Sequence, residues 1–216
     1  MESYQHILVV LPHPDDEGIV AGTLAAYIAQ GARVTYICLT LGEMGRNMGT
    51  PHFANRVSLP SIRKQELVEA CRNIGIQDLR MWGLHDKTVE FEDQERLDER
   101  LLATIEELGP ELIITFYPGY SVHPDHDATG AAVVRTVARI AADTRPIVQC
   151  IALSKGCKEI IGQPDITNDV SQYMSQKQAA IRSHRSQFHH LVGDSFDKPE
   201  KLARFTRERL WTYKLC

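Results

Sequence analysis

Short apolar runs alternate along the chain with longer segments in which apolar residues recur every three or four positions. The short runs are rich in β-branched residues, which is typical of buried strands. They lie at residues 7–11, 34–41, 79–84, 111–117 and 147–153. The longer segments have the spacing of amphipathic helices. They lie at residues 18–30, 62–74, 94–108, 128–142, 170–187 and 199–210.

The alternation of strands and helices predicts an α/β fold, with a Rossmann-like parallel sheet and helices on both faces. In the common strand order 3-2-1-4-5, strands one and four are neighbours. Ligand sites of such folds lie at the carboxyl ends of strands, near the point where the strand order reverses. We therefore expect the turns after strands one and four to meet and to form the active site.

The composition is that of an ordinary globular protein, and it narrows the range of partners. The chain has 216 residues, which suits a single domain over residues 1–216. A net charge of −4 provides no basic face for nucleic acid or for an anionic membrane surface. No apolar stretch approaches the ~20 residues of a membrane span, and the first apolar run is too short for a secretory leader. Five scattered cysteines without a C-x-x-C pair favour a reducing, cytoplasmic compartment.

Two clusters of histidine and acidic residues follow strands one and four. The first reads HPDDE at residues 13–17, and the second reads HPDHD at residues 123–127. Helix capping accounts for one or two of the acids, but not for the histidines or for the run of like charges. A divalent cation accounts for both, because imidazole and carboxylate groups bind Zn²⁺ and three protein ligands leave one position open. The spacing alone leaves open which carboxylate binds the metal.

The paired motif resembles the signature of the PIG-L/LmbE-like zinc de-N-acetylases. Further similarities to this family are GEMG at residues 42–45, Arg63 with Glu66, and Lys177, Ala180 and HRSQ at residues 184–187. Three other runs are similar to the second type of bacillithiol-biosynthesis deacetylase within the family. They are LGEMGRNMG at residues 41–49, FYPGY at residues 116–120 and WTY at residues 211–213.

The resemblance implies removal of acetate from N-acetylglucosaminyl-malate, a small N-acetylated glucosaminide. It also implies that His13, Asp16 and His126 bind Zn²⁺, that Asp15 is the general base, and that His123 is the acid or the oxyanion partner. Asp125 is placed to orient His123, although helix capping explains this residue equally well. Whether Zn²⁺ or Fe²⁺ fills the site in the cell stays open, as does the formation of a homo-oligomer.

Four residues on the active side of the expected sheet are candidates for contacts with substrate: Glu43, Arg46, Arg63 and Tyr120. The first two belong to a long loop at residues 42–58, which is suited to closing over a ligand or is simply solvated. Arg63 is suited to binding a carboxylate of the substrate, although an ion pair with Glu66 on the same helix is the alternative. For the tyrosine, the alternative is a place in the core.

The remaining histidines have no ligand pattern. His184, His189 and His190 are better explained by packing or solvent exposure than by a second metal site. His6, His52 and His85 are expected to be structural.

Other functions of an α/β fold make different demands on this sequence. A dinucleotide-binding oxidoreductase fails, because the first turn lacks G-x-G-x-x-G and its acids would repel phosphate. A non-catalytic metal-binding or sensor protein remains an alternative that a turnover assay distinguishes. Among enzymes, the alternatives are an amidase of bacillithiol S-conjugates and a broader N-acetylglucosamine de-N-acetylase.

Overall fold

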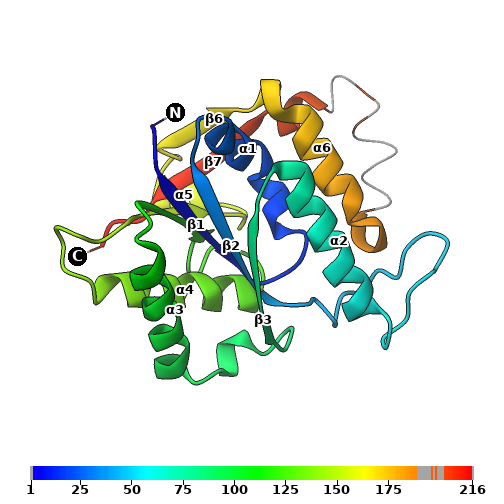
Figure 1. Cartoon of the computed structure of the whole chain (residues 1–216), viewed down its shortest axis with the longest axis horizontal. Coiled ribbons are helices and arrows are strands. Elements are labelled where there is room, and N and C mark those ends of the chain that lie inside the picture. The colour runs from blue at the N-terminus through cyan, green and yellow to red at the C-terminus, as the bar shows by residue number, and fades with distance from the viewer. Residues whose placement is uncertain (1, 189–195, 197, 199–201, 216) are drawn as a thin grey trace.

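The computed structural model describes residues 2–188, 196, 198 and 202–215. Within these residues, a seven-stranded sheet of order β3-β2-β1-β4-β5-β7-β6 lies between two layers of helices (Figure 1). Its parallel part comprises β1 (His6–Leu11), β2 (Arg33–Thr40), β3 (Asp78–Leu84), β4 (Leu112–Phe116) and β5 (Ile147–Ile151). The expected order 3-2-1-4-5 is therefore confirmed.

Strand β1 lies at the centre of the core, and both of its faces are buried. Ile7, Val9 and Leu11 pack into one apolar cluster, whereas Leu8 and Val10 pack into the other. Burial on both faces explains why the strand reads as a continuous apolar run rather than as an alternating one. The position immediately after this strand is therefore rigidly held.

Helices cover both faces of the sheet, as the sequence predicted (Figure 1). Residues of α1 (Ala21–Ala29) and α2 (Leu59–Ile74) pack into one cluster with α6 (Met174–Ser183), and residues of α3 (Gln94–Leu108) and α4 (Pro124–Ala138) pack into the other. Helix α4 begins four residues earlier than predicted, because His123 caps its first turn. The first predicted helix opens with a 3-10 turn, Asp16–Ile19, and another 3-10 turn, Ser171–Tyr173, precedes α6.

The predicted helix at residues 199–210 is wrong. Residues 199–201 lie outside the described residues, a 3-10 turn occupies Ala203–Phe205, and Arg207–Thr212 form strand β7. β7 runs antiparallel to β5 and to β6 (Ile166–Asp169), a strand that the sequence analysis did not predict. These two strands extend the sheet beyond its parallel part. The short helix α5 (Cys157–Ile161) lies between β5 and β6 in the chain.

The helices and the cysteines bear on the expected absence of a membrane span and of disulfide bonds. Among the helices of the described residues, none combines the length and the apolar character that a bilayer crossing requires. Cys38, Cys71, Cys150 and Cys157 are buried free thiols. This agrees with the expectation that the cysteines form no disulfide framework, as far as the described part of the chain extends.

Candidate active site

Two turns at the ends of neighbouring strands bring the metal-binding motif together. The first turn follows β1, and its Pro12 carbonyl accepts hydrogen bonds from the backbone N and the Oγ1 of Thr40, each at 2.9 Å. The second turn follows β4 and leads into α4. Because β1 and β4 pair directly, Nδ1 of His13 lies 3.2 Å from Nε2 of His126.

His13, Asp16 and His126 form a compact triangle of potential ligand atoms. Asp16 Oδ2 lies 3.3 Å from His13 Nδ1, and Asp16 Oδ1 lies 3.2 Å from His126 Nε2. Ligand atoms that share one tetrahedral Zn²⁺ at about 2.0–2.1 Å are ~3.3–3.4 Å apart. The separation of 3.2 Å between the two imidazole nitrogens is close to that value, while each imidazole faces a different oxygen of Asp16.

The hydrogen bonds around the two imidazoles direct their lone pairs into this triangle. Nδ1 of His126 lies 3.0 Å from the Ser121 carbonyl, so this nitrogen carries the proton and Nε2 is free to bind. Nε2 of His13 lies 3.1 Å from the Asp125 carboxylate and 3.2 Å from that of Asp86, so its proton is on this side and Nδ1 is free. Neutral imidazoles would therefore turn two acceptor nitrogens towards Asp16, whose Oδ2 accepts a hydrogen bond from the backbone N of His13 at 2.9 Å. A metal cation would stabilise this group of acceptors.

The pKa shifts in the triangle show that it attracts positive charge. Burial by itself would raise the pKa of Asp16, but His126 and His13 outweigh burial and lower that pKa well below its usual range. Burial would lower the pKa of His13, but the neighbouring carboxylates raise it well above its ordinary value. Protons and a metal ion therefore compete for the same nitrogen, and metal binding is expected to weaken as the pH falls.

Asp125 lies behind His13 rather than beside the ring of His123. Its carboxylate accepts hydrogen bonds from the backbone N of Lys87 at 2.6 Å and of Val89 at 3.2 Å, in addition to its contact with His13. His123 instead caps α4, since its Nδ1 accepts a hydrogen bond from the backbone N of Asp125 at 3.2 Å. The expected orientation of His123 by the Asp125 side chain is therefore replaced by a backbone contact.

Asp86 is a buried acid of this site that the sequence analysis missed. It follows β3, and its Oδ1 lies 3.2 Å from His13 Nε2 while its Oδ2 accepts a hydrogen bond from the Met44 backbone N at 2.9 Å. Its position just after a strand of the parallel sheet was a signal that could have identified it. Asp86 does not belong to a cluster of histidine and acidic residues like those at residues 13–17 and 123–127, so the motif search did not find it.

Asp15 differs from Asp16 in backbone conformation and partners. Its φ of 107° lies in the left-handed region, which is costly for a residue with a side chain. The carboxylate accepts a hydrogen bond from Arg63 Nη2 at 2.9 Å, and the backbone N donates to Glu17 Oε2 at 3.0 Å. Burial raises the pKa of Asp15 to about 6, against the opposing effect of Arg63. A carboxylate with this pKa is suited to general-base catalysis near neutral pH.

His123 packs edge-to-face against His13. The two ring centroids are 4.7 Å apart, and a ring nitrogen of His123 lies within 4.8 Å of ligand atoms of His13 and His126. Burial lowers the pKa of His123, and the neighbouring imidazoles lower it further. In the neutral ring Nδ1 accepts the α4 hydrogen bond, so the proton is on Nε2, where it is available to an oxyanion.

The candidate substrate residues differ in how they are held. Glu43 Oε1 accepts from the backbone N of Asp86 at 3.0 Å, and its Oε2 is buried without a hydrogen-bond partner. Arg46 is exposed, and Tyr120 is half-buried. The buried Arg63 donates to the carbonyls of Gly42 and Pro14 as well as to Asp15, and it does not pair with Glu66.

The other histidines do not form a second metal site in the described part of the chain. His184 is fully buried, and its Nε2 is in close contact with Glu17 Oε1, whereas residues 189 and 190 lie outside the described residues. His6 is buried and bonded to Thr35 and Leu108, which confirms a structural place. His52 and His85 are exposed.

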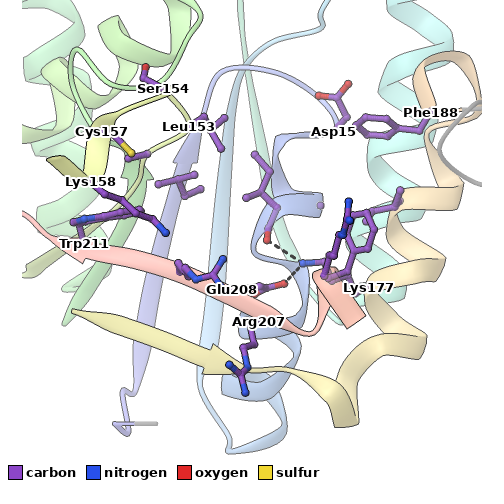
Figure 2. Close-up of a pocket in the computed structure, with 18 of the residues that line it drawn as sticks. Asp15, Leu153, Ser154, Cys157, Lys158, Lys177, Phe188, Arg207, Glu208 and Trp211 are labelled. Atoms are coloured by element: carbon purple, nitrogen blue, oxygen red, sulfur yellow. Dashed lines mark hydrogen bonds and ion pairs between the residues drawn. The ribbon is translucent and has the colours of Figure 1, made fainter. Parts of the chain in front are cut away.

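Two cavities flank the turns. One, of about 600 Å³, has Asp15 and Phe188 on one side and Lys158 and Trp211 on the other (Figure 2). Its lining is mainly apolar, and it contains the buried Lys177–Glu208 ion pair. The other, of about 690 Å³, is lined by His123, and Ser154 lines both cavities. A substrate amide between Asp15 and His123 would therefore have space on both sides.

The family model of GlcNAc-PI de-N-acetylase, or PIG-L, matches residues 8–137 and so includes both turns of the candidate metal site. The chain belongs to the PIG-L family. This confirms the resemblance inferred from the motifs. A curated relative from Bacillus cereus, named probable N-acetyl-alpha-D-glucosaminyl L-malate deacetylase 2, is 47% identical over 97% of this chain and 98% of its own.

Solved structures of similar fold include enzymes that catalyse different reactions. The N,N'-diacetylchitobiose deacetylase of Pyrococcus horikoshii has a TM-score of 0.76 at 23% identity, over 97% of this chain and 84% of that one. GalB of Pseudomonas putida, a 4-carboxy-2-hydroxymuconate hydratase, has a TM-score of 0.77 at 17% identity, over 97% and 96% of the two chains. The fold alone therefore does not identify the reaction, which must be argued from the site.

Proposed function

We propose that this PIG-L family enzyme hydrolyses the N-acetyl group of N-acetylglucosaminyl-malate, releasing acetate and the free glucosaminyl amine. The main support is the 47% identity, over nearly the whole chain, to a relative named for that substrate. The site agrees with amide hydrolysis, because it combines a possible ligand triangle with a carboxylate of raised pKa at Asp15 and an imidazole of lowered pKa at His123. The cytoplasmic location expected from the free cysteines remains a prediction.

In this proposal His13, Asp16 and His126 hold one divalent ion, which we take to be Zn²⁺. Such an ion acts as a Lewis acid: it lowers the pKa of water and polarises a carbonyl oxygen. Asp15 takes the proton from the attacking water, whose oxygen forms a bond to the acetyl carbon. His123 donates a hydrogen bond from Nε2 to the developing oxyanion. The C–N bond then breaks, and the proton held by Asp15 passes to the departing amine.

The malyl group brings two carboxylates close to an acidic site, so the substrate needs cationic contacts. Of the two arginines predicted for this role, the buried Arg63 already binds the Gly42 and Pro14 carbonyls and Asp15. The exposed Arg46, in the loop after β2, is therefore the candidate for a malyl carboxylate, and Glu43 and Tyr120 are the candidates for the sugar. A bidentate arginine–carboxylate contact contributes about 1.5–3 kcal/mol. Its loss should lower kcat/KM by roughly 10- to 150-fold for the malyl substrate.

The test is acetate release from N-acetylglucosaminyl-malate and from N-acetylglucosamine, by the wild type and by Arg46→Ala. We expect a clear preference for the malyl substrate, which Arg46→Ala loses while plain N-acetylglucosamine is much less affected. Arg63→Ala should slow both substrates, because Arg63 holds the carboxylate of Asp15. Turnover of neither substrate by the zinc-loaded protein would refute the proposed function. Equal loss on both substrates in Arg46→Ala would show that Arg46 does not bind the malyl group.

An amidase of bacillithiol S-conjugates is the second candidate, and one observation favours it. The cavity beside Asp15 is larger and more apolar than an acetyl group requires, with Leu153, Phe188 and Trp211 in its lining. Adding an S-conjugate to the same assay separates the two activities. Faster hydrolysis of the conjugate than of the acetyl substrate would reverse the assignment.

A further inference from the structure

Residues 184–187, which follow helix α6, connect three parts of the active site. Ser186 donates from its backbone N and its Oγ to the carboxylate of Glu66 on α2, at 2.8 and 2.7 Å. Its carbonyl accepts a hydrogen bond from Gly49 N at 3.1 Å. Gln187 and Asn47 exchange two hydrogen bonds, at 3.0 and 3.1 Å. This segment therefore binds the loop after β2 to helix α2.

The third connection runs from His184 to the metal-binding turn. His184 and Glu17 are both fully buried and are in contact through Nε2 and Oε1. The other oxygen of Glu17 accepts the backbone N–H of Asp15 at 3.0 Å and lies 3.5 Å from the Tyr36 hydroxyl. Both oxygens of this carboxylate are thus committed to partners within the protein.

The contact between Glu17 and Asp15 acts on the residue with the costly backbone conformation. Asp15 has a φ of 107°, and such conformations persist only where the surroundings enforce them. The hydrogen bond from its N–H to Glu17 holds the backbone, while Arg63 holds its carboxylate. Fixing Glu17 therefore fixes the direction in which the Asp15 carboxylate points.

We propose that His184 is a positioning residue that acts through Glu17 to hold Asp15 in its catalytic orientation. The inference rests on the proposed function, because it takes Asp15 to be the base. His184 touches neither the ligand triangle nor the rings of His123 and His126 in any described contact, and its Nδ1 has no hydrogen-bond partner. Its one side-chain hydrogen-bond contact among the described residues is with Glu17, and its charge also acts on Asp15 across the buried site.

The test is a double-mutant cycle of His184→Leu and Asp15→Asn, with acetate release and metal content measured for each protein. His184→Leu should lower kcat by roughly 10- to 100-fold, with KM within about 3-fold and metal content unchanged. In the Asp15→Asn background the same change should cost less than about 2-fold, because residues that act as a unit are non-additive. His184→Gln retains an N–H donor and should recover much of the rate.

Arg185→Ala is the matched control, since Arg185 is the exposed neighbour in the same segment. It should leave kcat, KM and metal content close to those of the wild type. If His184→Leu does not fold, the nearly isosteric Glu17→Gln replaces it in the cycle. A crystal structure of either variant should show that Asp15 has left the left-handed region.

The outcomes separate this inference from the proposed function. If the wild type hydrolyses neither acetyl substrate, the proposed function fails. If Asp15→Asn is nearly as active as the wild type, Asp15 is not the base, and the positioning proposal fails while the proposed function stands. If Asp15→Asn is impaired and the His184 effect multiplies with it, only the positioning proposal fails. Loss of metal in His184→Leu, or failure of His184→Gln to recover activity, would also overturn it.

Discussion

Asp15 and Asp16 are adjacent in the sequence but differ in almost every physical property. Asp16 has a side-chain exposure of 6% and lies between two imidazoles, whereas the carboxylate of Asp15 is 19% exposed and is held by Arg63. The backbone at Asp15 is in the left-handed region, and its carboxylate binds Arg63, whereas the carboxylate of Asp16 contacts His13 and His126. The sequence predicted that these acids serve different roles, but their spacing could not assign those roles.

The first prediction separates metal ligand from base. Asp15→Asn retains shape but loses basicity, so we expect the metal to stay while turnover falls by roughly 10²- to 10⁴-fold. Asp16→Asn should instead lose the metal, because a carboxylate ligand is removed from the triangle. Metal analysis and acetate release on both variants provide the measurement. The reverse pattern would mean that the two roles have been exchanged.

The second prediction concerns Asp86. Outer partners of a metal-binding histidine orient its ring, and their loss typically costs 10- to 100-fold in metal affinity. Because Asp125 also faces His13 Nε2, we expect Asp86→Asn to weaken metal binding by about 10-fold, measured by competition with a chelator. Asp143→Asn, on an exposed residue, is the control. An unchanged affinity would show that Asp125 alone is sufficient.

At the scale of single elements, β7 shows the most instructive difference between sequence and structure. Its residues alternate, with Glu208 and Leu210 buried and Arg207 and Arg209 exposed, which is the period of a strand. Because Glu208, one of the buried residues, is charged, a search for alternating apolar residues does not detect this strand. Tertiary partners make the burial favourable: Glu208 pairs with Lys177 and accepts from the backbone N of Gly22 and Thr23.

The third prediction follows from this buried glutamate. Glu208→Gln leaves Lys177 without its partner in a site that solvent barely reaches, so we expect the free energy of unfolding to fall by roughly 3–5 kcal/mol. Arg207→Gln, the exposed neighbour on the same strand, should change it by no more than about 0.5 kcal/mol. Urea denaturation of both variants measures the difference. Equal small effects would show that the ion pair is not critical.

For the whole molecule, the strand order was predictable because alternating strands and helices permit few arrangements. That order was sufficient to bring His13 and His126 together across more than a hundred residues. The direction of the Asp125 side chain was not predictable, because it depends on backbone groups of Lys87 and Val89 in a loop from a third strand. Contacts of this kind are set by tertiary structure and leave no local pattern.

The fourth prediction concerns the response of the folded molecule to acid. His6 contacts the carbonyl of Leu108 and the Oγ1 of Thr35, and burial, with the charge of Arg33, lowers its pKa below the usual value. The folded protein therefore binds fewer protons at His6 than the unfolded chain does. This contribution to stability is complete above the unfolded pKa of about 6.5 and is lost as the pH falls towards the folded pKa.

Urea denaturation at pH 7.5 and pH 5.5 measures this effect. Wild-type protein should lose more stability between the two pH values than His6→Gln, in which the side chain at position 6 no longer titrates in this range. His52→Gln, at an exposed histidine, should behave like the wild type. Identical losses in the wild type and in His6→Gln would contradict the prediction.

The link from His184 to the first turn also has a consequence for the order in which the protein is made. The turn at residues 13–17 is synthesised long before its partner segment at residues 184–187. The five parallel strands end at Ile151, so the parallel part of the sheet has been synthesised before that partner exists. A nascent chain that has folded this part of the sheet would therefore still lack the support of the proposed base, and we expect it to gain activity only after residue 187 has been added.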